Sequence, residues 1–329
     1  MNLEIFRTEL RNYPGITRKN LIHHVIDFFP TIPIPENSGK VIADWGEDAA
    51  VLDLSESQLL LFAADGIMKK LMDTDPFWAG YCAVLVNIHD IISMGGLPVA
   101  MVNILSISDK NTADAVLKGV NSAVEKFQVP VVGGHTHPDD EADAIAVAII
   151  GIVERDKVIY SHTAKPGEDI IAAMDLDGKT HPKVEFSWDT TRHKSSEQIW
   201  RQFNGIRSLA QKNLVNAGKD ISNPGLIGTL GMLTESSGVG AIVDLSTIQC
   251  PPDLELLHWL KMYQGMGFIV SVKPENSDAV IQTFIEAGLS ASRIGTITTD
   301  RKLILQDGKE SIEVFDFNVD SITGLKPDK

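Results

Sequence analysis

The chain has 329 residues, of which 43% are hydrophobic and 22% are charged, a balance typical of a globular protein long enough for two domains. Its net charge of −15 would repel nucleic acid, and the sequence contains no basic stripe to offset it, so we expect no nucleic-acid partner. It has no run of about eighteen apolar residues and no secretory signal pattern, so we expect a cytoplasmic protein without a membrane span.

Residues 1–154 alternate between helical and strand patterns rich in Ala and Val, which is typical of a mixed α and β domain with a largely buried sheet. Thr17, Asp75 and Thr112 are the expected N-caps of three helices, and Pro76 is favoured in the first turn after Asp75. The expected helices are residues 3–12, 17–29, 76–96 and 112–127, and the expected strands are 49–53, 58–65, 97–108, 129–132 and 142–153.

Residues 154–169 are polar, contain Pro and Gly, and are the expected linker to a second α+β domain. We therefore predict an α+β fold, with a mixed α/β pattern, in two domains over residues 1–154 and 155–329, ending in a loose tail from residue 318. The expected strands of the second domain are 169–176, 240–245, 267–272, 292–297 and 302–306, and the expected helices are 196–218, 224–238, 253–263 and 276–287.

Two short motifs place carboxylates where a strand begins or ends. In WGEDAAVLDL, Gly46 provides a turn and is followed by Glu47 and Asp48, which either hold a cation at the mouth of the sheet or form an ordinary polar loop. In FAADGI, Asp65 ends an apolar strand, which is a favoured position for a ligand, although an Asp-Gly pair also forms simple turns.

The long helix of residues 76–96 carries polar side chains on an apolar background, in the motif NIHDIISMGG. Asn87 and Asp90 are three residues apart and share a helix face, while His89 is expected to point elsewhere. Asp90 is near the C-terminus of the helix, where the helix dipole disfavours a carboxylate. A bound cation or a salt bridge to Lys or Arg would each remove this conflict.

The stretch VVGGHTHPDD gathers glycine, histidine and aspartate in one expected loop between two strands. His135, His137 and Asp139 imitate the HxHxDH signature of binuclear metallohydrolases, but Asp140 stands where that signature needs histidine. Zinc would also want further His or Cys donors at a recognisable spacing, and the sequence has none. Zinc hydrolysis is therefore a minor alternative.

The same stretch favours phosphate binding. Gly133 and Gly134 let backbone N–H groups come close to a phosphate, and Thr136 adds a hydroxyl donor; a solvated hairpin is the alternative. A second phosphate-loop pattern, AMDLDGKT at residues 173–180, is followed by His-Pro, which cannot continue into a helix interior. We predict a tight turn between strands there.

Two segments of the second half carry candidate binding groups. In AGKDISNPG, Lys219 and Asp220 precede a glycine-rich helix that begins at Asn223-Pro224, and its first N–H groups are expected to be free for an anion, unless the glycines only serve close packing. Residues 183–205 are basic and aromatic in an acidic chain, so they are expected either to recognise a second substrate or to form a mobile surface loop.

Five motifs in this order over residues 46–223 resemble those of the aminoimidazole ribonucleotide (AIR) synthetase superfamily, which has the PurM-like fold. GEDAAVL resembles the family's GDDAA, ADGI and NIHDIISMGG resemble its next two motifs, GGHT resembles GGDT, and DISN resembles DISD. The segments TRK, GYCAVLVN and GGHTHPD are similar to those of uncharacterised AIR synthase-related proteins, which include the group called methanogenesis marker protein 2.

The resemblance implies an N-terminal and a C-terminal AIR synthetase-like domain, and a homodimer in which the N-terminal sheets of two subunits associate. It also implies that ATP lies in a cleft with Mg²⁺ on its phosphates, and hard oxygen ligands of the kind that Mg²⁺ prefers are present. The implied residues are Asp48, Asp65, Asn87 and Asp90 for the metal, Gly46, Glu47, Gly133, Gly134, Thr136 and Asn223 for the nucleotide, and His135, Lys219 and Asp220 for catalysis.

We therefore expect an ATP- and Mg²⁺-dependent enzyme that phosphorylates a small metabolite or activates it through a phosphorylated intermediate, with a kinase similar to thiamine-monophosphate kinase as the variant. Two departures favour an alternative, because His135 replaces the aspartate of GGDT and Asn223 replaces the last aspartate of DISD. Either His135 contacts the γ-phosphate or carries a proton, or the protein binds ATP without turnover as a regulatory or maturation factor.

Overall fold

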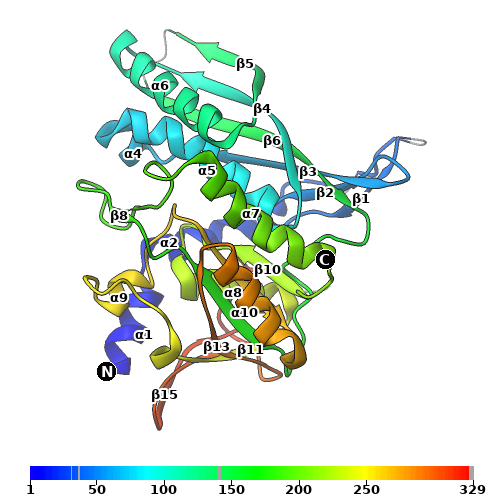
Figure 1. Ribbon diagram of the computed structural model, residues 1–329, viewed down its shortest axis with the longest axis vertical. Coiled ribbons are helices and arrows are strands. Elements are labelled where there is room, and N and C mark those ends of the chain that lie inside the picture. The colour runs from blue at the N-terminus through cyan, green and yellow to red at the C-terminus, as the bar shows by residue number, and fades with distance from the viewer. Residues whose placement is uncertain (31, 36–37, 139–141, 326–329) are drawn as a thin grey trace.

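Two β-sheets, one from each half of the chain, organise the fold (Figure 1). The structure is a computed structural model that describes residues 1–30, 32–35, 38–138 and 142–325. It confirms the predicted α+β class with mixed helices and strands. Within these ranges no helix is both long and apolar enough to cross a membrane.

The first sheet has six strands in the order β1-β2-β3-β6-β4-β5, of which β4 and β5 are parallel and the other neighbours antiparallel. One face packs against α5 and α6, and α5 is buried almost all round because it lies between this sheet and the second half of the chain (Figure 1). The elements are β1 (Lys40–Ala43), β2 (Ala50–Asp53), β3 (Gln58–Gly66), α4 (Lys69–Thr74), α5 (Pro76–Ser93), β4 (Leu97–Ser106), α6 (Lys110–Phe127), β5 (Val131–His137) and β6 (Ala144–Glu154).

The second sheet has seven strands in the order β10-β12-β7-β13-β11-β14-β15. Its central strands are buried on both faces, since Ile171 and Ala173 of β7 join the core around α5, whereas Ile170 and Ala172 belong to a second core. Two-sided burial accounts for the continuous apolar runs of these strands. The elements are β7 (Asp169–Met174), β8 (Lys179–Thr180), β9 (Trp188–Asp189), α7 (Ser196–Gln211), β10 (Ala217–Asp220), α8 (Gly225–Ser237), β11 (Gly240–Asp244), α9 (Leu256–Trp259), β12 (Gly267–Val272), α10 (Ser277–Glu286), β13 (Ser290–Thr298), β14 (Lys302–Asp307) and β15 (Glu310–Asp316), with short 3₁₀ turns at Leu245–Thr247 and Pro274–Asn276.

The N-terminal helix packs against the second sheet although it begins the chain. The helix expected over residues 3–12 is confirmed as α1 (Leu3–Arg11), and the side chain of Asn2 caps it. Leu3, Phe6 and Leu10 are buried in the second core, beside β15. The domain boundary at residue 154 stays a prediction, and a division there would separate α1 from the sheet that it covers.

Two expected helix starts are wrong. The helix expected over residues 17–29 is broken into α2 (Pro14–Thr17), a 3₁₀ turn (Arg18–Leu21) and α3 (Ile22–Ile26), and Thr17 caps none of them, because its backbone is already helical. The second wrong start is Thr112, since α6 begins earlier, with Asp109 accepting the N–H groups of Asn111 and Thr112.

Four further segments differ from expectation because tertiary pairing outweighs local pattern. Residues 133–137 are not a loop but part of β5, which pairs with β4. The helix expected over 196–218 ends at Gln211, and β10 follows and pairs with β12; the helix expected over 253–263 is reduced to α9. The tail is not loose up to residue 325, since the Glu235 carboxylate accepts the N–H groups of residues 322–324; residues 326–329 lie outside the described ranges.

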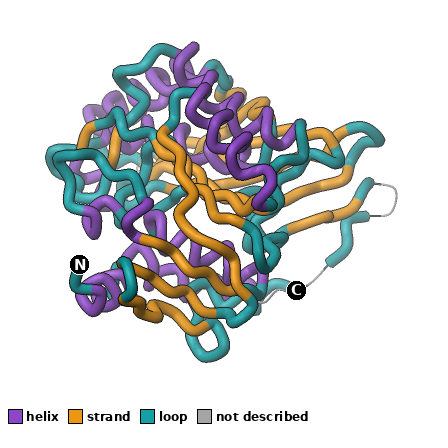
Figure 2. The backbone as a smooth tube through the Cα atoms, turned by 60° about the horizontal axis from the view of Figure 1, so that its bottom comes forward, coloured by secondary structure: helices purple, strands orange, loops and turns teal. Residues whose placement is uncertain are grey.

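The face of the first sheet opposite α5 and α6 carries exposed apolar side chains, and we name it the open face. Figure 2 shows the path of the backbone from a second direction, with the strands in orange. The pairing register places one residue from each of three strands side by side on it, for example Phe62 beside Ile150. Phe62 is 48% exposed and Ile104 is 56% exposed, which is unusual for large apolar residues in central strands. The apolar residues of the open face are Leu60, Phe62, Leu97, Val102, Ile104, Ile150 and Ile152.

Helices α5 and α6 approach closely because glycines face the backbone of the other helix. A Cβ atom on Gly80 would collide with the carbonyl of Val116, and one on Gly119 would collide with the carbonyl of Phe77. A backbone carbonyl in a packed helix cannot rotate away as a side chain can, so the two helices would have to separate.

We predict that Gly119→Ala destabilises the protein by about 1–3 kcal/mol, because overpacking of this helix pair outweighs the better helix propensity of alanine. The neighbouring Lys118→Ala, at an exposed position of the same helix, is the control and should change stability little. Urea unfolding curves of both variants measure the effect, and equal midpoints for the two would show that the close approach is not a constraint.

Candidate functional site

A cleft between the two halves of the chain gathers most of the predicted site residues. Its walls come from the loop before β2, the end of β3, one face of α5, strand β10 and the 3₁₀ turn after α2. Its cavity volume is about 500 Å³, which lies within the usual ~300–1,000 Å³ of a small-molecule site. The predicted residues that line it are Gly46, Glu47, Asp48, Asp65, Asp90, Lys219, Asp220 and Asn223.

Asp48 and Lys219 form a buried ion pair that joins the two halves. Lys219 also donates to the Gly46 carbonyl, and Asp48 accepts from the hydroxyl of Ser93 at 2.7 Å. Burial alone would lower the pKa of Lys219, but the charges of Asp48, Glu47 and Asp220 together raise it. Lys219 is therefore held as a cation, and it neutralises one of the carboxylates of the cleft.

Asp65 and Asn87, both predicted as metal ligands, are joined by a hydrogen bond, but only Asp65 lines the cleft. The Asp65 side chain faces the cleft, and burial raises its pKa, an effect that the charge of Lys19 opposes. Asn87 is fully buried behind it, where Oδ1 accepts the N–H of Asp65 at 3.2 Å and Nδ2 donates to the carbonyl of Ala83 at 2.8 Å. Asn87 thus fixes the end of β3 and offers the cleft no free oxygen in this arrangement.

Asp90 and Asp220 are carboxylates without a cation of their own. Burial, followed by the charges of Asp65 and Asp220, raises the pKa of Asp90 well above its usual range. Burial and then the charge of Asp48 raise the pKa of Asp220 to about 8. Lys219 pairs with Asp48, and within the described ranges no Lys or Arg lies within ion-pair distance of Asp65, Asp90 or Asp220. The site therefore concentrates negative charge that a cation would relieve.

These carboxylates do not form a ready-made metal cage. Among the described residues, no three His, Cys, Asp or Glu side chains are grouped closely enough to hold a metal ion by themselves. Mg²⁺ fits such a set nonetheless, because it usually binds one or two protein carboxylates and completes its shell with water and phosphate oxygens. Zinc, which needs three or four closely placed protein ligands, does not fit the described residues; Asp139 and Asp140 of the HxHxDH comparison lie outside them.

Glu47 ties the cleft to the segment between the domains. Its buried carboxylate accepts the N–H of Ser161 at 2.7 Å and contacts the ring of His162. Burial raises the pKa of Glu47, but His162, Lys219 and Ser161 together lower it, so it stays ionised. The same contact raises the pKa of His162. Because protein donors already occupy the Glu47 carboxylate, we infer that Glu47 holds the cleft together and does not bind a ligand.

Two cations at the cleft were not predicted from the sequence. Arg18 and Lys19 follow the short helix α2 and line the same cleft as the carboxylates. Burial lowers the pKa of Lys19, while the charges of Asp65 and Asp220 oppose this. The TRK stretch that contains them resembles that of related proteins, but no site role was predicted for it because an amphipathic helix was expected there. Only the tertiary placement of this segment brings Arg18 and Lys19 to the cleft.

Three buried polar atoms in the cleft wall have no partner within the described part of the chain: Nε2 of His89, Oδ1 of Asn223 and Oε1 of Gln264. The expectation that His89 points elsewhere is therefore wrong, since it lines the cleft between Phe203 and Phe268. Burial lowers the pKa of His89 to about 4, so its ring is neutral. Unpaired buried acceptors are costly, which indicates that a ligand supplies their donors.

The glycine–histidine stretch is not brought to this cleft. Gly133, Gly134, His135 and Thr136 lie in β5, at an exposed edge of the first sheet, and do not line the cleft of the same chain. Gly134 has a φ of 153°, and a Cβ there would collide with Asn103 of β4, so close strand pairing explains this glycine. His135 is in register with Ile104 and so belongs to the open face.

The structure settles three other expectations. The first two N–H groups of α8 bond to the carbonyls of Ser222 and Leu260, so they are not free for an anion. Residues 173–180 form a turn between β7 and β8 without a following helix, as predicted. Much of the segment 183–205 is packed rather than mobile, since Arg192 stacks on Trp78 and pairs with Asp189.

Known proteins have a similar fold and similar sequences. Residues 46–153 match the family described as AIR synthase related protein, N-terminal domain, and residues 146–308 match AIR synthase related protein, C-terminal domain. The fold and the cleft thus define a protein of the PurM-like class. The chain belongs to the AIR synthase-related family.

Two relatives match nearly whole chains. Uncharacterized protein MJ0640 of Methanocaldococcus jannaschii is 43% identical over 98% of this chain and 100% of its own length. Uncharacterized protein sll0787 of Synechocystis is 37% identical over 86% of this chain and 87% of its own. Thermotoga maritima PurL complexed with ATP has a TM-score of 0.77 at 16% identity, covering 100% of this chain and 53% of that chain, so this chain spans about half of PurL and the likeness shows the fold.

We predict that the protein without divalent cations loses stability as pH rises from about 5 to 8. Asp220 has a pKa of about 8 when folded against 3.8 otherwise, so in this window the folded state keeps a proton that the unfolded state has lost. Stability then falls by up to about 1.4 kcal/mol per pH unit. Asp220→Asn should flatten the curve, as measured by urea unfolding in EDTA; parallel curves for both proteins would contradict the assignment.

Proposed function

We propose that the protein binds ATP with Mg²⁺ in the cleft and uses it to phosphorylate a small metabolite or to activate it through a phosphorylated intermediate. The observation that carries this proposal is the convergence of Asp48, Asp65, Asp90 and Asp220, from four separate segments, on one cleft in which Lys219 neutralises Asp48. A triphosphate alone would be repelled by these acids. Divalent cations between the acids and the phosphates reverse the sign of the interaction.

The residues of the cleft have distinct parts in such a site. Mg²⁺ would supply charge neutralisation and orientation of the phosphates, and Asp65, Asp90 and Asp220 are the carboxylates free to hold it. Asn87 acts by positioning, since it holds the backbone of Asp65. Lys19 and Arg18 line the same cleft and are the cations available to pair with phosphate oxygens. Phosphoryl transfer of this kind needs positioning more than a dedicated protein nucleophile.

We propose further that two copies associate through the open face. A sheet face with this many exposed apolar side chains is suited to burial against an identical face, and a second copy provides it by two-fold symmetry. His135 lies on this face, so in the dimer it would face the partner rather than its own cleft. The dimer would then place the GGHT stretch at the subunit interface, whereas in a single chain this stretch does not line the cleft.

The alternative is a nucleotide-binding protein without turnover, and two residues favour it. His135 and Asn223 stand where the family has aspartates, so fewer carboxylates are available for cations. Release of ADP in the presence of pooled phosphorylated and amide metabolites separates the two. Tight ATP binding with no ADP from any pool supports the non-catalytic protein, and a pool that accelerates ADP release supports the enzyme, including a kinase similar to thiamine-monophosphate kinase.

We predict that Asp90→Asn weakens ATP binding by about tenfold or more in the presence of Mg²⁺, about 1.4 kcal/mol. In EDTA the variant should bind ATP no worse than the wild type, because the lost interaction runs through the metal. Isothermal titration calorimetry with and without Mg²⁺ measures this, with Asp114→Asn on the exposed side of α6 as the matched control. An equal loss with and without metal would make Asp90 a structural residue.

We predict that Ile104→Lys on the open face converts the protein from dimer to monomer, since a lysine buried in an apolar interface has no partner. Leu117→Lys is the control, because Leu117 is also apolar and exposed but lies on α6, away from the open face. Sedimentation velocity gives the masses. A wild-type monomer, or an Ile104→Lys variant that stays dimeric, would refute the interface.

A further inference from the structure

Residues 321–325 form part of the cleft wall, and nothing in the proposed function uses them. We name this segment the strap. Its residues Thr323 and Leu325 line the cleft that holds the carboxylates. Leu325 also approaches the loop before β2, since a Cβ on Gly46 would lie 3.0 Å from Cδ1 of Leu325. The strap therefore completes the cleft although it is distant in sequence from the other walls.

Glu235 of α8, which is 4% exposed, holds the strap. Its Oε1 accepts the N–H groups of Ile322 at 3.1 Å and Gly324 at 3.2 Å. Its Oε2 accepts the N–H of Thr323 at 2.8 Å and the hydroxyl of Thr323 at 2.6 Å. Hydrogen bonds to a carboxylate are stronger than those between neutral groups. One side chain thus fixes the backbone of three successive residues.

The strap in turn contacts residues 14–26, which we name the N-terminal segment. The carbonyl of Thr323 accepts the N–H of His23 at 3.2 Å. Gly324 has a φ of 75°, and a Cβ there would lie 2.9 Å from the ring of His23. The strap and the N-terminal segment are therefore in close contact, and a displacement of the strap would release His23.

The N-terminal segment has little of its own to hold it in place. It consists of two helices and a 3₁₀ turn of only four or five residues each, and no side chain caps any of them. The 3₁₀ turn and α3 contain no fully buried residue. Helical pieces this short are marginal by themselves. Contacts with the rest of the chain must therefore set where Arg18 and Lys19 lie.

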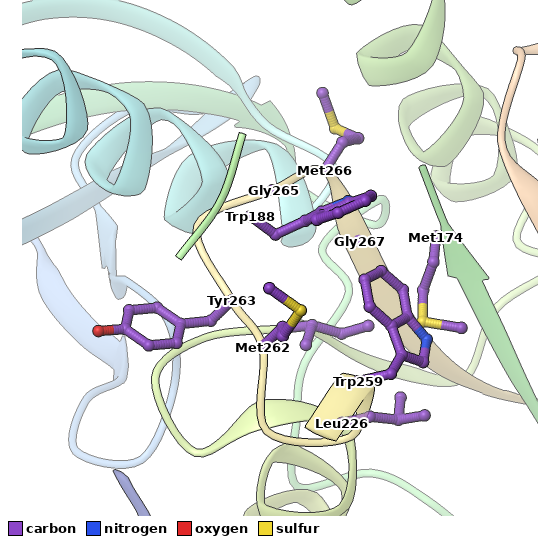
Figure 3. Close-up of a pocket in the computed structure, with 10 residues that line it drawn as sticks. Met174, Trp188, Leu226, Trp259, Met262, Tyr263, Gly265, Met266 and Gly267 are labelled. Atoms are coloured by element: carbon purple, nitrogen blue, oxygen red, sulfur yellow. The ribbon is translucent and has the colours of Figure 1, made fainter. Parts of the chain in front are cut away.

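Helix α8 makes the first of these contacts directly. A Cβ on Gly228 would lie 2.6 Å from Cγ1 of Ile16, so α8 touches the N-terminal segment just before Arg18. The start of α8 is itself anchored, because Leu226, which lies below Trp259 in Figure 3, belongs with it to the second core. Helix α8 is thus a fixed support for the N-terminal segment.

The second contact runs through the strap. Glu235 lies two turns beyond Gly228 on α8, about 10 Å along the helix, and its bonds to the strap reach His23. Arg18 and Lys19 lie between Ile16 and His23 in the chain, so they are held between two contacts that one helix provides.

We propose that Glu235 is a positioning residue, which acts through the strap on the N-terminal segment and so sets the place of Arg18 and Lys19 in the cleft. The inference rests on the proposed function, because phosphate oxygens are what these cations would meet. A displacement of about an ångström is enough to spoil such a contact. Removal of the negative charge of Glu235 would by itself favour an anion. Weaker phosphate binding after that removal would therefore reveal positioning.

We expect Glu235→Gln to weaken MgATP binding about fivefold or more, because an amide NH₂ group cannot accept the N–H groups that the lost oxygen accepted. Thr323→Val removes only the hydroxyl bond to Glu235 and should weaken binding about twofold, so the test survives if Glu235→Gln does not fold. Glu168→Gln is the matched control, since Glu168 is a buried carboxylate that accepts from Lys165 and Ser271 and does not line the cleft. Isothermal titration calorimetry measures all three variants.

A background with Arg18→Met and Lys19→Met separates positioning from a general loss of structure. If Glu235 acts through these two cations, Glu235→Gln should cost no further affinity for MgATP in that background. An equal loss in both backgrounds overturns the proposal, and so does unchanged or tighter binding when Glu235→Gln is the single change.

Hydrogen exchange measured by NMR tests the strap without a nucleotide. Glu235→Gln should speed exchange of the amides of residues 322–324 and, with them, that of His23. A wild type that binds no MgATP, in a protein whose His23 amide responds in this way, would refute the proposed function and leave the strap standing. MgATP binding by the wild type, with no response at His23, would do the reverse.

Discussion

Repulsion among carboxylates that share one cleft is the constraint on which this site depends. Asp48, Asp65, Asp90 and Asp220 are brought together from different elements, and the protein around them raises the pKa of the last three. Burying like charges costs stability unless protons or cations compensate it. The apolar core packed around α5 offsets this loss of stability. A concentration of unpaired acids in a cleft indicates a binding site more than a structural network, because a structural network would pair them.

The ion pair of Asp48 and Lys219 also decides how the two halves of the chain meet. Asp48 comes from the loop before β2 and Lys219 from β10, and Glu47 adds a contact with Ser161 in the segment that joins the halves. Charged contacts therefore join the two halves at the cleft, while α5 lies between the sheets (Figure 1). A change in the charge of the cleft thus acts on the packing between the halves as well as on ligands.

The sequence allowed much of the site to be predicted, but not all of it. Asp48, Asp65 and Asp90 lie at a strand start, a strand end and a helix face, so local pattern was enough to nominate them. The same reasoning was wrong for β5. Its glycines favoured a loop, but the segment pairs with the parallel strand β4. Lys19 belongs to the TRK stretch that resembles related proteins, but no role was predicted for it, since only the packing of a broken helix brings it to the cleft.

Charge alone would make this cleft poorly selective, because metal and triphosphate are common to every nucleoside triphosphate. Selection must come from neutral parts of the wall, where a buried acceptor left without a donor penalises the wrong ligand. Asn223 then contributes a hydrogen-bond acceptor of its own, and it is more than the loss of a carboxylate. Its Oδ1 is buried beside Tyr263 without a partner among the described residues, and an aspartate there would add one more negative charge to the cleft that Asp220 lines. An amide in this place keeps an acceptor for the ligand while it lessens the repulsion that the carboxylate cluster must bear.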